Sequence, residues 1–174
     1  MANLDIRPEP QYPDILVSLH LINTNPPRFH WALFVPDPVV STGTKFHAVT
    51  DHSEPGSGIF TYDKSITVLP SDRGVATAAI IGSLGSRSVN DLDTLLSSIP
   101  CNTVPSVDRE REPRFTCRVW LREAVRRMHG AGFIRCADVD ALEKEILFYG
   151  EKAAQEIDND TFEYATLHQS LHSF

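Results

Sequence analysis

The sequence predicts an α+β fold in which a largely antiparallel β-sheet packs against helices. Apolar runs of strand length occupy about the first half of the 174 residues, and amphipathic segments with helical spacing occupy the second half. Strands that precede helices along the chain are typical of this class rather than of a parallel, doubly wound sheet. The length suits one domain, which we expect over residues 14–174, after a loose proline-rich leader over residues 1–13.

The strand candidates are short apolar runs separated by turn residues. The clearest is residues 28–35 (RFHWALFV), which is largely apolar on both faces and is therefore expected to be a central strand. Its period of two places Trp31 on one face and His30 on the other. The remaining candidates are residues 14–22, 45–50, 59–62, 65–69 and 75–81, with turns expected at 23–27 and at Asp63-Lys64.

Helices are expected after residue 87. Ser88 is a suitable N-cap because Asp91 follows three residues later, ahead of apolar residues at helical spacing. Residues 114–128 and 138–157 are amphipathic, and a short last helix is expected within residues 160–171. Residues 100–113 form an irregular connection. The arginines of the 114–128 segment lie outside its apolar stripe and are expected to face solvent or to bind an anionic group: Arg118, Arg122, Arg126 and Arg127.

Composition and charge exclude several classes of function. The formal net charge is −7 and no uninterrupted basic run exists, so nucleic acid is not an expected partner. No segment approaches the roughly 20 apolar residues of a membrane helix, so no integral membrane segment is expected. The N-terminal residues do not resemble a secretory signal, and the three cysteines do not form a disulfide framework. These features predict a cytoplasmic protein.

Cys117 and His30 are the residues whose positions indicate chemistry. Cys117 lies about one turn inside the predicted 114–128 helix, where the helix N-terminus would favour a thiolate and could hold an oxyanion. His30 could act as its base, and His47 on the next strand could orient that imidazole. The alternative is that Cys117 is a buried structural cysteine and His30 a hydrogen-bonded core histidine.

Three segments resemble a known family: RFHWALFVPDPVV, FHAV and FTCRVWLREAVRRM. They are similar to the circularly permuted branch of the NlpC/P60-type papain-like fold. That branch includes lecithin:retinol acyltransferase-like proteins, small phospholipase/acyltransferases and permuted deSUMOylating-type isopeptidases. In it, the strand histidine precedes the nucleophilic cysteine, as His30 precedes Cys117 here. Thr116 stands where these families usually have asparagine, and Arg28 where the acyltransferases often have tyrosine.

The resemblance implies a papain-like α+β domain that hydrolyses or transfers an acyl group of an ester, thioester or amide, without a cofactor. Cys117 would form the acyl-enzyme, His30 would be the general base, and His47 would fix its tautomer. The substrate would be a small molecule, a lipid or a peptide, and no oligomeric state is predicted. The candidate substrate-binding residues are Arg28, Trp31, Thr116 and Trp120.

Other interpretations remain open at this point. The same fold could support a small-molecule cyclase or isomerase that uses His30 as acid and base, or a binding module without activity. His30, His47 and Cys117 could instead ligate zinc. We expect Cys101 and Cys136 to be bystanders, and His168 with His172 to belong to a solvated tail.

Overall fold

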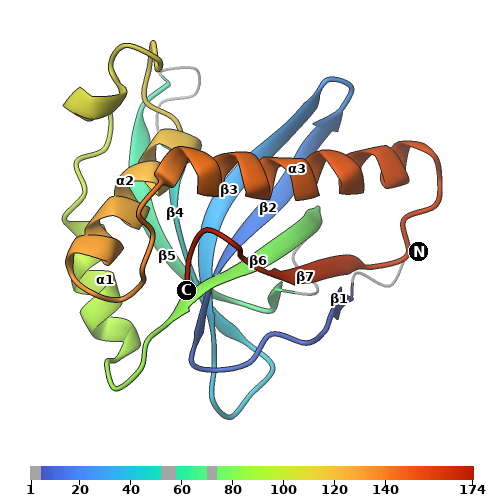
Figure 1. The fold of residues 1–174 in the computed structure, drawn as a ribbon, viewed down its shortest axis with the longest axis horizontal. Helices are drawn as coiled ribbons and strands as arrows, with labels where there is room; N and C mark the ends of the chain where they lie inside the picture. The colour runs from blue at the N-terminus through green and yellow to red at the C-terminus, as the bar shows by residue number, and fades with distance from the viewer. Residues whose placement is uncertain (1–4, 52–57, 70–73) are drawn as a thin grey trace.

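The computed structural model describes residues 5–51, 58–69 and 74–174. Seven strands form one mixed sheet in the order β1-β7-β6-β2-β3-β4-β5, and α-helices pack along it (Figure 1). The pairings of β2 with β3, β2 with β6, β3 with β4 and β4 with β5 are antiparallel, and those of β7 with β1 and β6 are parallel. The structure is therefore of the predicted α+β class, with a largely antiparallel sheet.

The central strands agree with the sequence pattern. They are β2 (Asp14–Thr24), β3 (Pro27–Pro36), β4 (Gly43–Thr50) and β6 (Val75–Ser83). In β3, Trp31 belongs to the large apolar cluster against the helices, whereas Phe34 belongs to a smaller cluster on the other side. The prediction that β3 is a central strand with apolar residues on both faces is confirmed.

The predicted turn at Asp63-Lys64 is wrong. Residues on both sides of it form one continuous strand, β5 (Phe60–Thr67), which pairs with β4 in unbroken register. Both charged side chains find partners on opposite faces of the strand. Asp63 contacts His47, and the Lys64 ammonium lies 2.6 Å from a carboxylate oxygen of Asp93. These pairings explain why two charged residues continue the strand.

The far edge of the sheet differs from the prediction. The short helix expected within residues 160–171 is instead β7 (Ala165–Gln169), which runs parallel to β6. Ala165 and Leu167 alternate with more exposed residues and enter the smaller apolar cluster, which favours a strand. In place of a loose leader, Ile6 and Arg7 form β1 (Ile6–Arg7), and Ile6 is buried beside β7. Residues 1–4 of the expected leader lie outside the described residues.

The helices begin at side-chain caps. Helix α1 (Val89–Ser97) has the predicted capping box between Ser88 and Asp91. Helix α2 (Cys117–Gly130) begins three residues later than predicted, and α3 (Val139–Asp158) begins after Asp138, whose carboxylate accepts the Ala141 N–H. Within the 100–113 connection lies the short 3-10 helix η2 (Ser106–Asp108). None of the helices in the described ranges has the length and apolar character of a membrane span.

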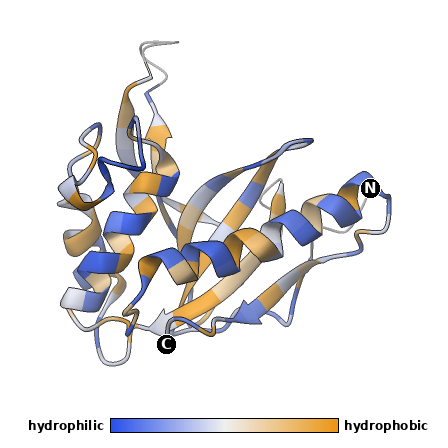
Figure 2. Cartoon of the chain, turned by 45° about the horizontal axis from the view of Figure 1, so that its top comes forward, coloured by the Kyte–Doolittle hydropathy of each residue, from blue (hydrophilic) through white to orange (hydrophobic). Residues whose placement is uncertain are grey.

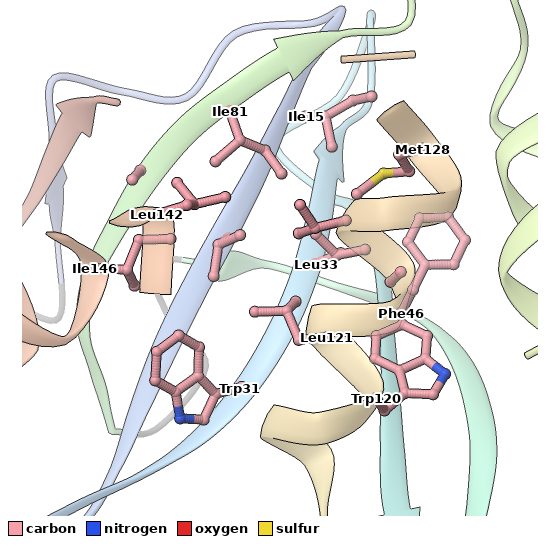
Figure 3. Packing of buried hydrophobic residues seen from close by; sticks show 14 of the residues in the cluster. Ile15, Trp31, Leu33, Phe46, Ile81, Trp120, Leu121, Met128, Leu142 and Ile146 are labelled. Carbon is pink, nitrogen blue, oxygen red and sulfur yellow. The ribbon is translucent and has the colours of Figure 1, made fainter. Parts of the chain in front are cut away.

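The main core lies between the helices and the sheet. Hydrophobic and hydrophilic residues alternate along α2 and α3 (Figure 2), and the apolar side chains meet those of the central strands (Figure 3). Trp31 and Leu33 of β3 pack there with Leu121 of α2 and Ile146 of α3. At Gly150, α3 approaches the sheet so closely that a Cβ would lie 2.6 Å from Leu19 Cδ1. A larger residue at position 150 would force the buried Leu19 side chain to shift.

Candidate active site

The candidate site lies where β3 and β4 separate. Residues 33–36 of β3 pair with residues 43–46 of β4, and the pairing stops there although both strands continue. Figure 1 shows the unpaired halves diverging toward the end of the sheet at which α2 begins. His30 and His47 both lie in these unpaired halves. The divergence therefore opens the sheet beside two of the three residues that the sequence predicts to be catalytic.

A hydrogen bond joins these two histidines across the gap. His30 Nε2 lies 2.7 Å from His47 Nδ1, and the rings meet edge to face. His47 is buried, and His30 is partly exposed. This is the geometry that an orienting role for His47 requires, because a strong bond at one nitrogen fixes the plane and the tautomer of the imidazole.

Asp63 extends the pair, and the sequence reasoning missed it. Its Oδ2 lies 3.0 Å from His47 Nε2, because Asp63 is directly opposite His47 in the register of β5 and β4. Interpreting Asp63-Lys64 as a turn leaves Asp63 outside the sheet, so that interpretation does not place it beside His47. Continuing the two-residue alternation of residues 59–62 through position 63 would have placed Asp63 on a strand face, where a partner on β4 is expected.

The carboxylate sets the direction of the hydrogen bonds. Ionised Asp63 can only accept, so His47 donates through Nε2–H and keeps a lone pair on Nδ1. His30 then donates through Nε2–H to His47, which leaves the lone pair of His30 on Nδ1. A proton taken up at His30 Nδ1 produces an imidazolium whose charge is stabilised through His47 toward Asp63. With these hydrogen bonds, a proton accepted by His30 would bind at Nδ1.

A third histidine lies beside this chain of hydrogen bonds. His20 of β2 is directly opposite His30 in the register, and the ring centroids are 6.1 Å apart. The Nε2 atom of His20 lies 3.0 Å from the Oγ of buried Ser18. Polar side chains therefore continue across neighbouring strands from β2 to β5. The sequence reasoning did not single out His20, although its position in the predicted strand 14–22 was recognised.

Cys117 is the first residue of α2 rather than a residue one turn inside it. The helix starts there because Thr116 is the N-cap, and its Oγ1 accepts the Val119 N–H at 3.3 Å. The Cys117 sulfur accepts a hydrogen bond from the backbone N–H of Trp31, the residue that follows His30 on β3. The start of α2 therefore brings the thiol to β3 at the level of His30, whose own described contacts are with His47 and His20.

Burial raises the pKa of the Cys117 thiol above its usual range. The backbone N–H groups of Trp31, Arg118 and Cys117 itself point toward the sulfur and oppose this effect without cancelling it. The resting residue is consequently a neutral thiol near neutral pH, and a base must remove its proton before it can act as a nucleophile.

The four candidate substrate-binding residues occupy different environments. The indoles of Trp31 and Trp120 are buried in the main core, where Trp120 lies 6.0 Å from the ring of Tyr62. The Trp120 Nε1 donor has no hydrogen-bond partner within the described part of the chain. Thr116 is engaged as the N-cap of α2, and Arg28 is exposed near the start of β3. The indoles thus support the site from within the core, and Arg28 is the exposed member of the set.

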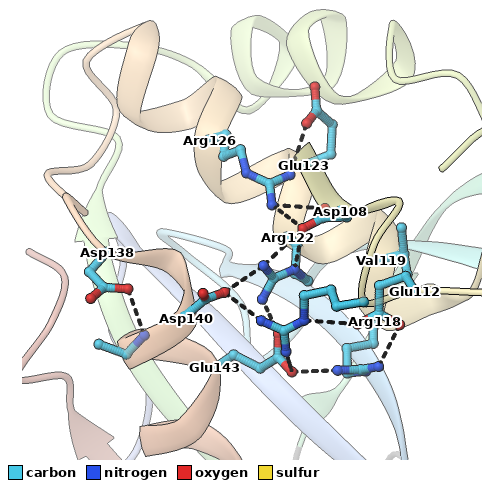
Figure 4. A network of polar contacts seen from close by, with 12 residues as sticks. Asp108, Glu112, Arg118, Val119, Arg122, Glu123, Arg126, Asp138, Asp140 and Glu143 are labelled. Atoms are coloured by element: carbon cyan, nitrogen blue, oxygen red, sulfur yellow. Dashed lines mark hydrogen bonds and ion pairs between the residues drawn. The ribbon is translucent and has the colours of Figure 1, made fainter. Parts of the chain in front are cut away.

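The arginines of α2 form an ionic network rather than a solvated face (Figure 4). Arg122 is only 4% exposed and contacts Asp108, Asp140 and Glu143. Its neighbours are also paired: Arg118 with Glu112 and Glu143, Arg126 with Asp108 and Glu123, and Arg127 with Glu123. The network joins the 100–113 connection, α2 and α3. The expectation of a solvent-facing Arg122 is wrong because carboxylates from two other segments cover it.

The other candidates are placed as follows. Among the residues that the structure describes, no group of three His, Cys, Asp or Glu side chains could hold a metal ion, including the proposed zinc ligands. Cys101 and Cys136 are free cysteines that form no disulfide, and burial raises the pKa of both thiols. His168 lies in β7 and stacks on Tyr149, with ring centroids 3.7 Å apart, instead of belonging to a solvated tail.

Comparison with known proteins identifies a family for this chain. Residues 17–135 match the model of a family of unknown function, DUF6540. No curated protein and no solved structure matches the chain. The matched residues extend from β2 to the loop after α2, and they include His30, His47, Asp63 and Cys117.

Proposed function

Because the chain belongs to the DUF6540 family of unknown function, we propose its activity from the site alone: it is a thiol-dependent hydrolase or acyltransferase. The substrate would carry an ester, thioester or amide. The observation that carries the proposal is the pair of hydrogen bonds that connect His30 to His47 and His47 to Asp63. Cys117, at the start of α2, contacts β3 at Trp31, the residue that follows His30. A nucleophile, a base and an orienting group are the components that covalent acyl transfer requires.

The proposed reaction begins with a neutral thiol. His30 Nδ1 removes the proton of Cys117 as the sulfur attacks the substrate carbonyl, and the resulting imidazolium is stabilised through His47 by Asp63. The tetrahedral intermediate collapses to a thioester on Cys117, and the imidazolium of His30 gives its proton to the leaving group. Water or another acceptor then donates a proton to His30 and attacks the thioester. The bond between the acyl carbon and sulfur breaks, the acylated product leaves, and the imidazolium of His30 returns its proton to the sulfur to regenerate the thiol.

The position of Cys117 supports stabilisation of the oxyanion. The first N–H groups of an α-helix have no partner within the helix, and their dipoles favour negative charge. Cys117 is the first residue of α2, so its own N–H has no acceptor within the helix; this N–H points toward the sulfur, beside which the substrate oxygen would bind, while Thr116 accepts the N–H of Val119. We assign the Cys117 N–H as one oxyanion donor.

We further propose that the fold is of the permuted papain-like type. Three features support this proposal: a histidine in a central strand precedes the cysteine along the chain, a polar partner for that histidine lies on the next strand, and the cysteine begins a helix that packs on both strands. The mixed sheet with helices is compatible with this type and with other α+β folds.

The second candidate is a small-molecule cyclase or isomerase in which His30 acts as acid and base without a covalent intermediate. The raised pKa of the Cys117 thiol favours it, because a protonated thiol is a weak nucleophile. His20, whose ring lies 6.1 Å from that of His30, would then be a second proton donor on the same side of the sheet.

Acyl trapping distinguishes the two candidates. The protein is incubated with p-nitrophenyl esters and acyl thioesters of increasing chain length, and intact mass and peptide mapping locate any adduct. We expect acylation of Cys117, its loss in Cys117→Ser, and a rate at least about 100-fold lower in His30→Ala. Cys101→Ser is the control and should behave as wild type. Turnover of a substrate that survives Cys117→Ser and disappears in His30→Ala would exclude the acyl-enzyme and favour the second candidate.

A further inference from the structure

Strand β5 forms one edge of the sheet, and its outer backbone groups can be identified. The Asp51 N–H donates to the Ile59 carbonyl at 2.8 Å, so the groups of residue 59 face β4. Because the direction alternates along a strand, the groups of residues 61, 63 and 65 also face β4. Those of Phe60, Tyr62, Lys64 and Ile66 therefore point away from the sheet.

The side chain of Asn102 binds the first of these outer positions as a neighbouring strand would. Its Oδ1 accepts the Phe60 N–H at 2.7 Å, and its Nδ2 donates to the Phe60 carbonyl at 2.8 Å. A primary amide thus replaces the peptide group of an added strand. Beyond it, the outward groups of Tyr62, Lys64 and Ile66 have no backbone partner in the described ranges of the chain.

The open part of β5 lacks the usual protection of sheet edges. Natural edges are commonly shortened, bulged, interrupted by proline or charged. The opposite edge follows this rule, because β1 contains two residues. By contrast, β5 contains eight residues without proline and pairs with β4 without a bulge. Its lysine is neutralised on the helix side by Asp93, at 2.6 Å.

The side chains along this edge indicate what would pair with it. The Asp63 side chain is 45% exposed, and Ile66 is 70% exposed on the other face of the strand. Opposite charges at directly facing positions of antiparallel strands are favourable, and an exposed apolar residue favours an apolar partner. An added strand is therefore expected to place a basic residue opposite Asp63 and an apolar residue opposite Ile66.

A second copy of this chain fits the edge poorly. When two β5 strands pair antiparallel, all of residues 61–67 take part only in the register that places Lys64 opposite Lys64 of the second copy. In this register Asp63 lies opposite Ser65 of the second copy and gains no basic partner, and each chain carries a formal net charge of −7. The edge and its side chains thus favour a different chain.

We propose that the β5 edge is a docking site for an extended peptide segment of a partner protein. The segment adds antiparallel to Tyr62–Ile66, with lysine or arginine opposite Asp63 and an apolar residue opposite Ile66. Main-chain hydrogen bonds supply the affinity, as in other cases of strand addition, and the two side chains supply the selectivity. Asn102 ends the docking site at Phe60. The proposal does not depend on the acyl-transfer activity.

The test uses the capped peptide Thr-Val-Thr-Thr-Lys-Val-Thr, which places valine opposite Ile66 and lysine opposite Asp63. Amide resonances of the labelled protein are followed to about 1 mM peptide, the concentration range for weak strand addition. We expect shift changes along β5 and slower hydrogen exchange at Tyr62, Lys64 and Ile66. The inward amide of Ser65 is the internal control, because its partner on β4 already protects it.

Two matched peptides test the register. N-methylation of the central threonine removes an N–H that faces Lys64 and should abolish binding. N-methylation of the preceding threonine, opposite Ser65, alters an N–H that points to solvent and should be tolerated. Asp63→Lys should weaken the lysine peptide roughly three- to tenfold and favour a glutamate version of it.

Several outcomes would overturn the proposal. One is the absence of shift changes at Tyr62, Lys64 and Ile66 at the highest peptide concentration. Another is equal binding of the two N-methylated peptides, which would mean that the contact is not strand addition. Concentration-dependent protection of β5 without peptide, together with a dimer in light scattering, would assign the edge to a second copy instead.

Discussion

The buried carboxylate of Asp108 allows the sharpest stability prediction. Asp108 has no exposed surface and accepts hydrogen bonds from Arg122 at 2.9 and 3.0 Å and from Arg126 at 2.6 and 2.8 Å. Asp108→Asn keeps the size of the side chain and removes its charge. Breaking a buried ion pair costs about 3–5 kcal/mol when the remaining charge has no other partner. Because Arg122 keeps Glu143, we expect a smaller loss of about 2–3 kcal/mol in the free energy of unfolding.

Urea unfolding followed by tryptophan fluorescence measures this change, because the indoles of Trp31 and Trp120 are buried in the native state. The matched control is Glu123→Gln, which removes a carboxylate that pairs within α2 with Arg126 and Arg127. Surface pairs of this kind contribute about 0–1 kcal/mol. If Asp108→Asn costs no more than Glu123→Gln, the network does not hold the 100–113 connection against α2, and the reasoning from burial fails.

Three further predictions follow from single residues. Because burial raises the pKa of Cys117, its alkylation by iodoacetamide should be slow at neutral pH and should increase only above about pH 8.5. Rapid alkylation at pH 6 that is lost in His30→Ala would instead show a preformed ion pair between the Cys117 thiolate and the His30 imidazolium. Gly150→Ala should destabilise the protein by about 1–3 kcal/mol in urea because the buried side chains of Leu19 and Phe29 must shift to make room for the added methyl group. Gly130→Ala should not, because a Cβ at that position meets nothing within 4 Å. Burial alone would raise the pKa of Asp108, but its two arginines outweigh burial and hold that pKa below the ordinary aspartate value of 3.8. The folded state therefore binds fewer protons, and stability that is present above about pH 4 should decrease as the pH falls further. Urea midpoints between pH 3 and 7 measure this loss, and a similar decrease in Asp108→Asn would contradict the assignment to this carboxylate.

The central strands and the starts of α1 and α3 could be predicted because local patterns determine them. The apolar run of residues 28–35 and the capping box at Ser88 each carry their own signal. The strand β7 could not be predicted in this way. Its five residues are held by parallel pairing with β6, which is distant along the chain, and the alternation of Ala165 and Leu167 is too short to identify a strand.

The candidate site was predictable in part for the same reason. A histidine on each of two successive strands predicts a possible contact, and His30 and His47 make it. The separation of β3 and β4 and the inclusion of Asp63 depend on how the elements pack together. No pattern within a single segment contains that information.

The ionic network of α2 has a consequence for how this family can change over evolutionary time. Each arginine in it contacts carboxylates from more than one segment or shares them with a neighbour, so replacing one carboxylate alone removes part of the compensation of a buried charge. Exchanging Arg122 and Glu143 together for apolar residues reduces that penalty, because Arg126 still pairs with Asp108 and Glu112 still pairs with Arg118. Among related sequences, these positions should therefore vary in concert, as charged sets or as apolar sets, and intermediates with one member replaced should be rare.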